Sequence, residues 1–264
     1  VLSDGEGWSS GGFMADCKFD GTVSSGSQQQ YMFRNNQWGF YENGVWNMVF
    51  VGQETSSTPY GEWPYAPYTN ASESPKVQEK PYICYDDEKG YGVMVPTMRK
   101  NATGISWDKK VTGTFYSLNT FYIADSEKDN SDTLNSALKE GKNILFTPGV
   151  YTIEKPLSVT KKDTIIYGMG LATLEATKGT SAMEVADEDG IKVCGLLFEA
   201  GEKKSQTLLK VGDKKTDVSH ENNPLCFSDV YFRVGGGKYA GKVDNCVTIN
   251  SNDVIGDNFW VWRG

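Results

Sequence analysis

The second half of the chain carries a degenerate repeat. Its copies begin at Asp163, Asp189, Asn223 and Asn252, and each is a polar turn, a short apolar run and then a Gly or Asp. In the last three copies a second apolar run follows at once. The copies recur roughly every 27 to 35 residues, a spacing typical of stacked repeats. Because Gly or Asp at a constant position can bend a strand, the pattern predicts a β-solenoid.

Residues 1–52 show a similar alternation of strand-like runs and Gly, Ser or Asn turns. We interpret them as the terminal coils of a first solenoid unit. Residues 53–115 have no such period, and we expect a linker there. Within it, Pro81–Tyr85 and Tyr91–Pro96 flank a polar turn and predict a β-hairpin.

Residues 116–264 are expected to form a second β-solenoid unit. It begins with the one clear helix pattern of the chain, at 131–141, in which Asn or Ser can cap the start and Gly141 ends the helix. A short helix before the first coil can cover the open end of a stack, since an uncapped end exposes a sheet edge and an apolar core. The predicted fold is therefore all-β with one capping helix.

Several stretches carry a family resemblance. They include GWSSGGFMADCKFDGTVSSGSQQQYMFRNNQWG, VWNMVFVG, EKPYICYD, LFTPGVYTI, GMGLATL, AMEVADEDGIKVCGLLFEAG and VIGDNFWVWR, and they span nearly the full length. The chain resembles the secreted pectate-lyase-like right-handed parallel β-helix proteins related to the two-β-helix glucanases of glycoside hydrolase family 55. The resemblance implies two β-helical units joined by the linker and hairpin.

The resemblance also implies an inverting β-glucanase with a Glu acid and a water held by polar side chains. In such proteins the strand ending in WVWR continues into an Ala-Asp-His-Gly stretch and further coils. This chain has Gly264 there, and both of its ends look cut. We therefore expect the open end to be covered either by a further chain segment or by self-association.

Charge excludes some partners. The formal net charge is −8, the pI is about 4.8 and there is no Lys/Arg cluster. Nucleic acid and anionic membranes are therefore not expected as partners, and no apolar stretch is long enough for a membrane span. An acidic polysaccharide would also be repelled unless a cation bridged it, so we expect a neutral polysaccharide.

Glycoside hydrolysis needs a protonated carboxyl near the scissile oxygen and a second carboxylate or a positioned water. Glu199 and Asp257 follow or begin strand runs in different coils and could face one groove, so they are the catalytic candidates. The alternative is that both are solvated turn residues. A calcium-dependent lyase would need clustered acids; Asp187-Glu188-Asp189 is compact, but we interpret it as a solvated corner. No cofactor is predicted, with calcium kept open for the lyase alternative.

The segment from Gly26 to Trp38 is the best binding candidate. In a strand Gln28 and Gln30 would share one face, and their amides match sugar hydroxyls. Arg34 could add a hydrogen-bonding fork and Trp38 a stacking platform. The alternative is an Asn/Gln ladder that stacks along the solenoid.

Trp46, Trp260 and Arg263 complete the predicted binding set. Trp260 and Trp262 point to one face of their strand, and Phe259 and Val261 to the other. An exposed Trp pair would be a sugar platform, whereas packing between the two units is the competing interpretation.

The remaining signals concern the environment. The single His, His220, lies in a polar loop and is expected at the surface. The five Cys show no CxxC pair, so no zinc site is predicted; Cys194 and Cys226 are either stacked buried thiols or a disulfide. Asn70 and Asn101 begin sequons and favour a secreted glycoprotein.

The sequence thus predicts an extracellular protein that acts on carbohydrate. The first hypothesis is a family-55-like glycoside hydrolase on a neutral polysaccharide such as a β-glucan. The second is a non-catalytic polysaccharide-binding or structural protein of a cell surface or filament, and the third is a calcium-dependent polysaccharide lyase.

Overall fold

The computed structural model shows an all-β chain that divides into two compact units. One unit comprises residues 1–79 and 96–114, and the other 80–95 and 115–264. The structure describes residues 7–9, 11–42, 47–54, 68–108, 111–237 and 240–264. Within these ranges no helix is long and apolar enough to cross a membrane.

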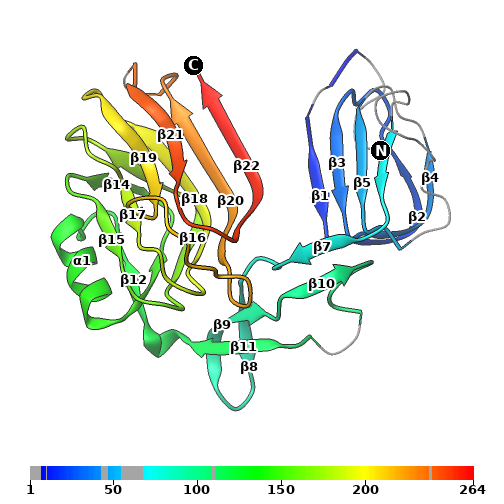
Figure 1. Ribbon diagram of the computed structural model, residues 1–264, viewed down its shortest axis with the longest axis horizontal. Coiled ribbons are helices and arrows are strands. Elements are labelled where there is room, and N and C mark those ends of the chain that lie inside the picture. The colour runs from blue at the N-terminus through cyan, green and yellow to red at the C-terminus, as the bar shows by residue number, and fades with distance from the viewer. Residues whose placement is uncertain (1–6, 10, 43–46, 55–67, 109–110, 238–239) are drawn as a thin grey trace. The chain divides into compact units, whose positions relative to one another are not determined.

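The second unit is built from two parallel sheets between which the chain alternates (Figure 1). The first sheet has the order β12 (Phe121–Ala124), β13 (Asn143–Phe146), β16 (Ile165–Ala176), β18 (Lys192–Ala200), β20 (Leu225–Val234) and β22 (Val254–Arg263), and β14 (Val150–Ile153) pairs with β16. The second has the order β15 (Leu157–Val159), β17 (Met183–Val185), β19 (Ser205–Val211) and β21 (Val243–Ile249). The four predicted copies are β16, β18, β20 and β22, and they lie side by side.

A left-handed residue bends three of these strands at the same place. Gly195 has φ 70°, Asp229 has φ 52° and Asn258 has φ 61°, and the residues on either side of them pair in register. Gly, Asp and Asn are the residues that adopt this conformation most easily. The constant bend position is therefore confirmed, although in the last copy it falls at Asn258, one residue beyond the expected Asp257.

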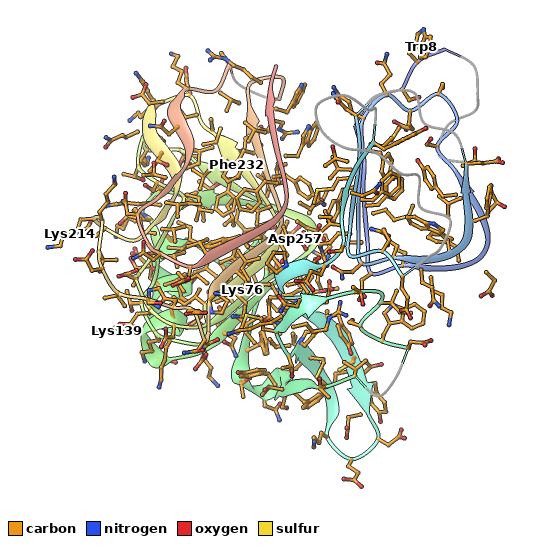
Figure 2. The ribbon with its side chains drawn as sticks, turned by 45° about the vertical axis from the view of Figure 1, so that its right-hand side comes forward. Trp8, Lys76, Lys139, Lys214, Phe232 and Asp257 are labelled. Carbon is orange, nitrogen blue, oxygen red and sulfur yellow. The ribbon has the colours of Figure 1, made fainter. Side chains whose placement is uncertain are left out.

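Apolar side chains fill the interior between the two sheets. Phe198 and Phe232 are fully buried and stack with their ring centroids 5.4 Å apart; Figure 2 labels Phe232 in this interior. Fully burying a side chain of this kind stabilises the fold by about 1.5 to 3 kcal/mol. Stacking of equivalent apolar positions in successive repeats makes one continuous core.

The predicted helix is confirmed as α1 (Ser131–Glu140). The Asn130 side chain caps its first turn in a capping box with Thr133, and Gly141, at φ 87°, ends it. Its buried residues include Leu134 and Leu138, which join the core. The helix packs on β13 and β15, at the end of the stack away from β22 (Figure 1).

The predicted hairpin is confirmed as the antiparallel pair β8 (Tyr82–Asp86) and β9 (Gly90–Pro96), with β11 (Gly113–Ser117) beside β9. A short 3₁₀ helix, Leu118–Thr120, follows. Val93 packs with Phe121, Leu145 and Ile165 in a small second cluster. The hairpin therefore covers the outer side of the first sheet and groups with the second unit.

The first unit also contains parallel sheets. One has the order β1 (Phe13–Ala15), β3 (Tyr31–Arg34), β5 (Met48–Val51) and β6 (Tyr68–Ala71), and another pairs β2 (Lys18–Ser24) with β4 (Gln37–Glu42). An antiparallel pair joins β7 (Ser74–Val77) to β10 (Arg99–Ala102). The core is aromatic: Phe33 stacks on Phe50 with ring centroids 5.0 Å apart, and Trp38 and Tyr41 pack edge-on against them.

Candidate functional site

Two tryptophans form an exposed aromatic pair on β22. Trp260 and Trp262 alternate with core-side residues and point outward, with relative exposures of 57% and 38%. Their rings are stacked, with centroids 6.3 Å apart and an interplanar angle of 11°. Tyr231 lies opposite Trp260 on β20, with the two ring centroids 6.4 Å apart. We call Tyr231, Trp260 and Trp262 the tryptophan face.

The predicted division of β22 holds in part. Phe259 packs against the core, as expected for the opposite side of the strand. Val261 lies in register with the buried Phe232 but is itself 55% exposed. Its inward direction is therefore correct, whereas its burial is not.

An ion pair borders the tryptophan face. Arg233 is in register with Trp262 on one side and with Glu199 on the other. Its Nε donates to Glu199 Oε1 at 2.9 Å and its Nη2 to Oε2 at 2.7 Å. The hydrogen bond to Glu199 raises the pKa of the Arg233 guanidinium. The surface thus combines aromatic rings with a fixed planar donor group.

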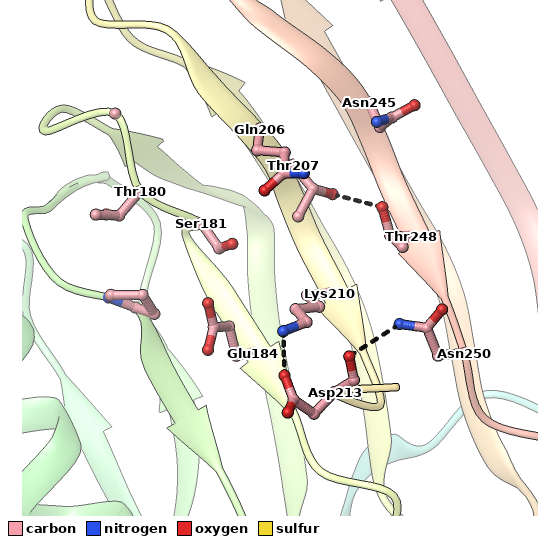
Figure 3. A pocket seen from close by; sticks show the side chains of 12 residues that line it. Thr180, Ser181, Glu184, Gln206, Thr207, Lys210, Asp213, Asn245, Thr248 and Asn250 are labelled. Carbon is pink, nitrogen blue, oxygen red and sulfur yellow. Dashed lines mark hydrogen bonds and ion pairs between the residues drawn. The ribbon is translucent and has the colours of Figure 1, made fainter. Parts of the chain in front are cut away.

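A polar groove of about 550 Å³ lies on the second sheet (Figure 3). Glu184, Lys210 and Thr248 follow one another in register across β17, β19 and β21. Lys210 forms an ion pair with Asp213, and Thr248 donates to the Thr207 hydroxyl at 3.3 Å. Hydroxyls, amides and charges at this density suit a ligand rich in hydroxyl groups.

The predicted catalytic carboxylates lie on different parts of the surface. Glu199 follows the Gly195 bend of β18, whereas Asp257 precedes the Asn258 bend of β22 and lies in register with Ser228. Figure 2 labels Asp257 on its strand. The two carboxylates therefore lie on opposite sides of the bend position, and their facing one groove stays a prediction.

Four predicted binding residues of the first unit need correction. Trp38 is 4% exposed and forms part of the aromatic core, so it offers no open stacking surface. Arg34 is 7% exposed, and its two terminal nitrogens each donate to Glu79 at 2.9 Å. Gln28 is buried and Gln30 exposed, because the strand begins only at Tyr31.

The alternative interpretation, an Asn/Gln ladder along the solenoid, fits Asn36 and Gln53. The Asn36 side chain accepts from Cys17 N at 2.9 Å and donates to Met14 O at 2.9 Å. The backbone N–H of Asn36 in turn donates to Gln53 Oε1 at 3.1 Å. Amides at the same corner of successive repeats therefore satisfy buried backbone groups.

Two other predicted binding residues have different outcomes. Trp46 lies outside the described residues. Arg263 is exposed on β22, in register with Val234 and next to Trp262. Among the described members of the predicted binding set, Trp260 belongs to the tryptophan face, whereas Arg263 lies on the opposite side of β22, the side of Val234.

His220 is buried, which corrects its expected place at the surface. It is 2% exposed, and its ring nitrogens contact Asp189 at 2.7 Å and Asp187 at 3.0 Å. Burial lowers the pKa of His220, but the hydrogen bonds and charges of both carboxylates outweigh it and leave the pKa raised. Glu188 and Asp189 are exposed, as expected for a solvated corner, and Asp187 and Asp189 are in addition the ring partners of His220.

The cysteines are free thiols. Cys194 and Cys226 are both buried, which confirms the thiol alternative, but Cys194 lies in register with Ser228 and Cys226 with Lys192. They are offset by two residues and do not stack directly. Among the residues that the structure describes, no group of three or more His, Cys, Asp and Glu could hold a metal ion.

The asparagines of both sequons are exposed. Asn70 lies in β6 and Asn101 in β10. Their glycosylation stays a prediction.

Lys80 and Asp229 were missed as functional candidates. They form an ion pair between residues far apart in sequence, and the only signal in the sequence was the place of Asp229 at the end of a repeat run. Its partner Lys80, in the segment before β8, had no such signal.

The stacked parallel sheets, between which the chain alternates, define a protein of the pectate-lyase-like class. The model of the LAM55 pectate lyase-like domain matches residues 121–264. The chain belongs to this family.

The chain is also similar to characterised proteins. It is 42% identical over 264 residues to an exo-β-1,3-glucanase of Streptomyces sp. (strain SirexAA-E / ActE). The matched region covers 100% of this chain and 43% of that protein. The solved structure of sacteLam55A from Streptomyces sp. SirexAA-E matches with a TM-score of 0.93 at 41% identity, covering 99% of this chain and 47% of that one. A variant of the same protein in complex with glucose matches with a TM-score of 0.92 at 41% identity and the same coverage. The chain thus spans less than half the length of these relatives.

Proposed function

We propose that this chain is a glucan-directed protein that recognises β-1,3-linked glucose polymers as part of a glycoside hydrolase. The support is its similarity to the exo-β-1,3-glucanase over its whole length. We further propose that the alternation between the two parallel sheets is a right-handed parallel β-helix and that the protein is extracellular. The exposed Asn70 and Asn101 support the extracellular location.

The tryptophan face is the single structural observation that carries the proposal. One face of a glucose ring presents C–H groups, and these pack on the flat face of an indole. Trp260 and Trp262 offer two stacked indoles at the surface. Because exposed aromatic clusters on soluble proteins mark binding sites, we assign sugar stacking to them. Arg233, in register with Trp262, supplies hydrogen-bond donors beside the rings.

Catalysis by Glu199 and Asp257 stays a prediction, and their geometry favours another role. An inverting mechanism places two carboxyl groups about 6.5 to 9.5 Å apart around the scissile bond and keeps one of them protonated. Both oxygens of Glu199 instead accept hydrogen bonds from Arg233, the arrangement of an ionised carboxylate. This contact favours the non-catalytic binding protein as the second candidate function.

The test is a panel of neutral glucans with β-1,3, β-1,4, β-1,6 and α-1,4 linkages. Reducing-sugar release and calorimetric binding are both measured on each polymer. The proposal expects β-1,3-glucan to be preferred in both. Binding without release supports the non-catalytic alternative, and neither binding nor release from any polymer contradicts the proposal. Release only from an acidic polymer added to this panel, and only with calcium, would support the lyase.

A further inference from the structure

A cleft of about 380 Å³ opens at the bend of the first sheet, next to the tryptophan face. Asp229 lies at the bend itself, and Tyr167 and Tyr231 flank it. Lys80 reaches the cleft from the segment before β8. All of these residues belong to the second unit, and none of the roles discussed above uses the cleft.

Charges in the cleft cancel. Lys80 Nζ forms an ion pair with Asp229 Oδ2, and Asn258 Nδ2 donates to Asp229 Oδ1 at 2.7 Å. Burial lowers the pKa of Lys80, but the hydrogen bond and charge of Asp229 outweigh it and leave the pKa raised. An ion pair of this kind offers donors and acceptors without a net charge. It therefore suits a neutral polar ligand better than an anion or a cation.

One wall of the cleft is a lip that the next repeat lacks. Between Tyr167 and Ala172 the chain has four residues, whereas β18 has the single residue Gly195 at the same place. The lip carries the exposed apolar side chains of Met169 and Leu171.

The lip is also strained. Leu171 has φ 57°, a conformation that is unfavourable for a bulky residue. Strained residues of this kind cluster at binding and active sites, where the surrounding structure holds them in place. An exposed leucine held in this conformation contributes little to the core, so its apolar surface is available to a ligand.

Asn258 and Tyr231 join the cleft to the tryptophan face. Asn258 Nδ2, which binds Asp229, also contacts the Tyr231 hydroxyl at 3.0 Å. Tyr231 lines the cleft, and its ring lies 6.4 Å from that of Trp260. The cleft and the tryptophan face therefore adjoin at Tyr231, and one extended ligand could contact both.

We propose that this bend cleft binds one sugar ring of the same neutral glucan that stacks on the tryptophan face. The inference rests on the proposed function. Asp229 accepts hydrogen bonds from sugar hydroxyls, and Lys80 and the Tyr231 hydroxyl donate hydrogen bonds to them. Leu171 packs on the C–H face of the sugar ring. The volume lies within the usual range for small-ligand clefts.

The test uses the whole chain and a β-1,3-linked glucotetraose. Affinity is measured by calorimetry, and the Tyr231 side chain is followed by NMR on ¹³C-labelled tyrosine, with Tyr231→Phe to assign its signal. Asp229→Asn keeps the shape and the bend, because Asn258 already adopts this conformation in the next repeat. We expect it to bind about tenfold more weakly, as for a lost hydrogen bond to a charged group.

Leu171→Gly is the second variant, because it removes the lip side chain and relieves the strain. We expect it to keep the wild-type thermal midpoint and to bind several-fold more weakly. Asp87→Asn, in the exposed hairpin turn, is the matched control and should bind as the wild type does.

Each outcome is decisive. One contrary outcome is wild-type affinity in both cleft variants and an unmoved Tyr231 signal, together with weaker binding by Trp260→Ala. It would overturn sugar binding by the cleft and leave the proposed function standing. Absence of any binding by the wild type would overturn both. Weaker binding by Asp229→Asn and Leu171→Gly, with a shifted Tyr231 signal, supports the cleft.

Discussion

Arg233 holds Glu199 through two hydrogen bonds, from Nε to Oε1 at 2.9 Å and from Nη2 to Oε2 at 2.7 Å. The Glu199 side chain is 12% exposed and the Arg233 side chain 31%. A bidentate pair of this kind fixes the guanidinium plane, and Arg233 lies in register with Trp262. The pair therefore orients a donor group at the edge of the tryptophan face.

Glu199→Gln should leave any glucan hydrolysis within a few-fold of wild type and lower the free energy of unfolding by about 1 to 2 kcal/mol. The amide keeps one acceptor and loses the charge. Reducing-sugar release and urea unfolding measure the two effects. A loss of about a hundredfold or more in release, at unchanged stability, would identify Glu199 as the catalytic acid instead.

Gly190→Ala should destabilise the protein by about 2 to 4 kcal/mol. Gly190 has φ 74°, and a Cβ there would lie 2.1 Å from Asp163 Oδ1 and 2.3 Å from Asn223 Nδ2. These two side chains are hydrogen-bonded to each other at 2.8 Å, so the methyl group would break a contact between the first and third copies of the repeat.

Gly90→Ala is the control for this substitution. Gly90 has the same φ of 74°, but a Cβ there meets nothing within 4 Å. Gly90→Ala should lower the free energy of unfolding only by the backbone strain, about 1 to 2 kcal/mol. Equal losses of unfolding free energy in the two variants would show that the contact between Asp163 and Asn223 contributes nothing.

Stability should depend on pH through His220. Its folded pKa lies above the ordinary value of 6.5 because Asp189 and Asp187 outweigh the effect of burial. The charged form therefore stabilises the fold fully below 6.5, and this contribution is lost as the pH rises through the folded pKa. Asp253 also faces this loop, since its carboxylate accepts from His220 N at 3.0 Å.

His220→Gln should remove this dependence. We expect the free energy of unfolding of the wild type to exceed that of the variant by about 1 to 3 kcal/mol at about pH 5.5 and by less at about pH 8.5. Urea unfolding at both pH values measures the difference. A difference that is the same at both would mean that the His220 charge does not contribute.

Thiol reactivity should separate the cysteines by burial. Burial raises the pKa of Cys194 to about 12 and that of Cys226 to about 11. Since the thiolate is the reactive form, neither should react with a thiol reagent in the native protein at neutral pH. Both should react after unfolding in urea. Rapid labelling of Cys194 in the folded state, read by peptide mass spectrometry, would contradict its burial.

The repeats could be predicted from the sequence because local chemistry determines them. A polar turn, an apolar run and a residue that tolerates the left-handed conformation recur in each copy, and the same residues form β18, β20 and β22. The helix was equally local, since Asn130 and Gly141 mark its ends.

The candidate site was less predictable because it depends on contacts between distant segments. His220 looked like a surface residue because its own loop is polar, but its two partners lie 31 and 33 residues away. Arg34 looked available to a ligand, but Glu79 binds it across 45 residues. The face to which Trp260 points could be predicted because strand alternation alone sets it.

The affinity of the tryptophan face for β-1,3-glucan tests the central claim most directly. We would compare by calorimetry the wild type, Trp260→Ala, Trp262→Ala and the control Trp8→Ala, whose indole is 72% exposed elsewhere on the chain. Each face variant should bind about tenfold more weakly, a loss of about 1.4 kcal/mol, at unchanged thermal stability. Trp8→Ala should bind as the wild type does. Wild-type affinity in both face variants would contradict the account.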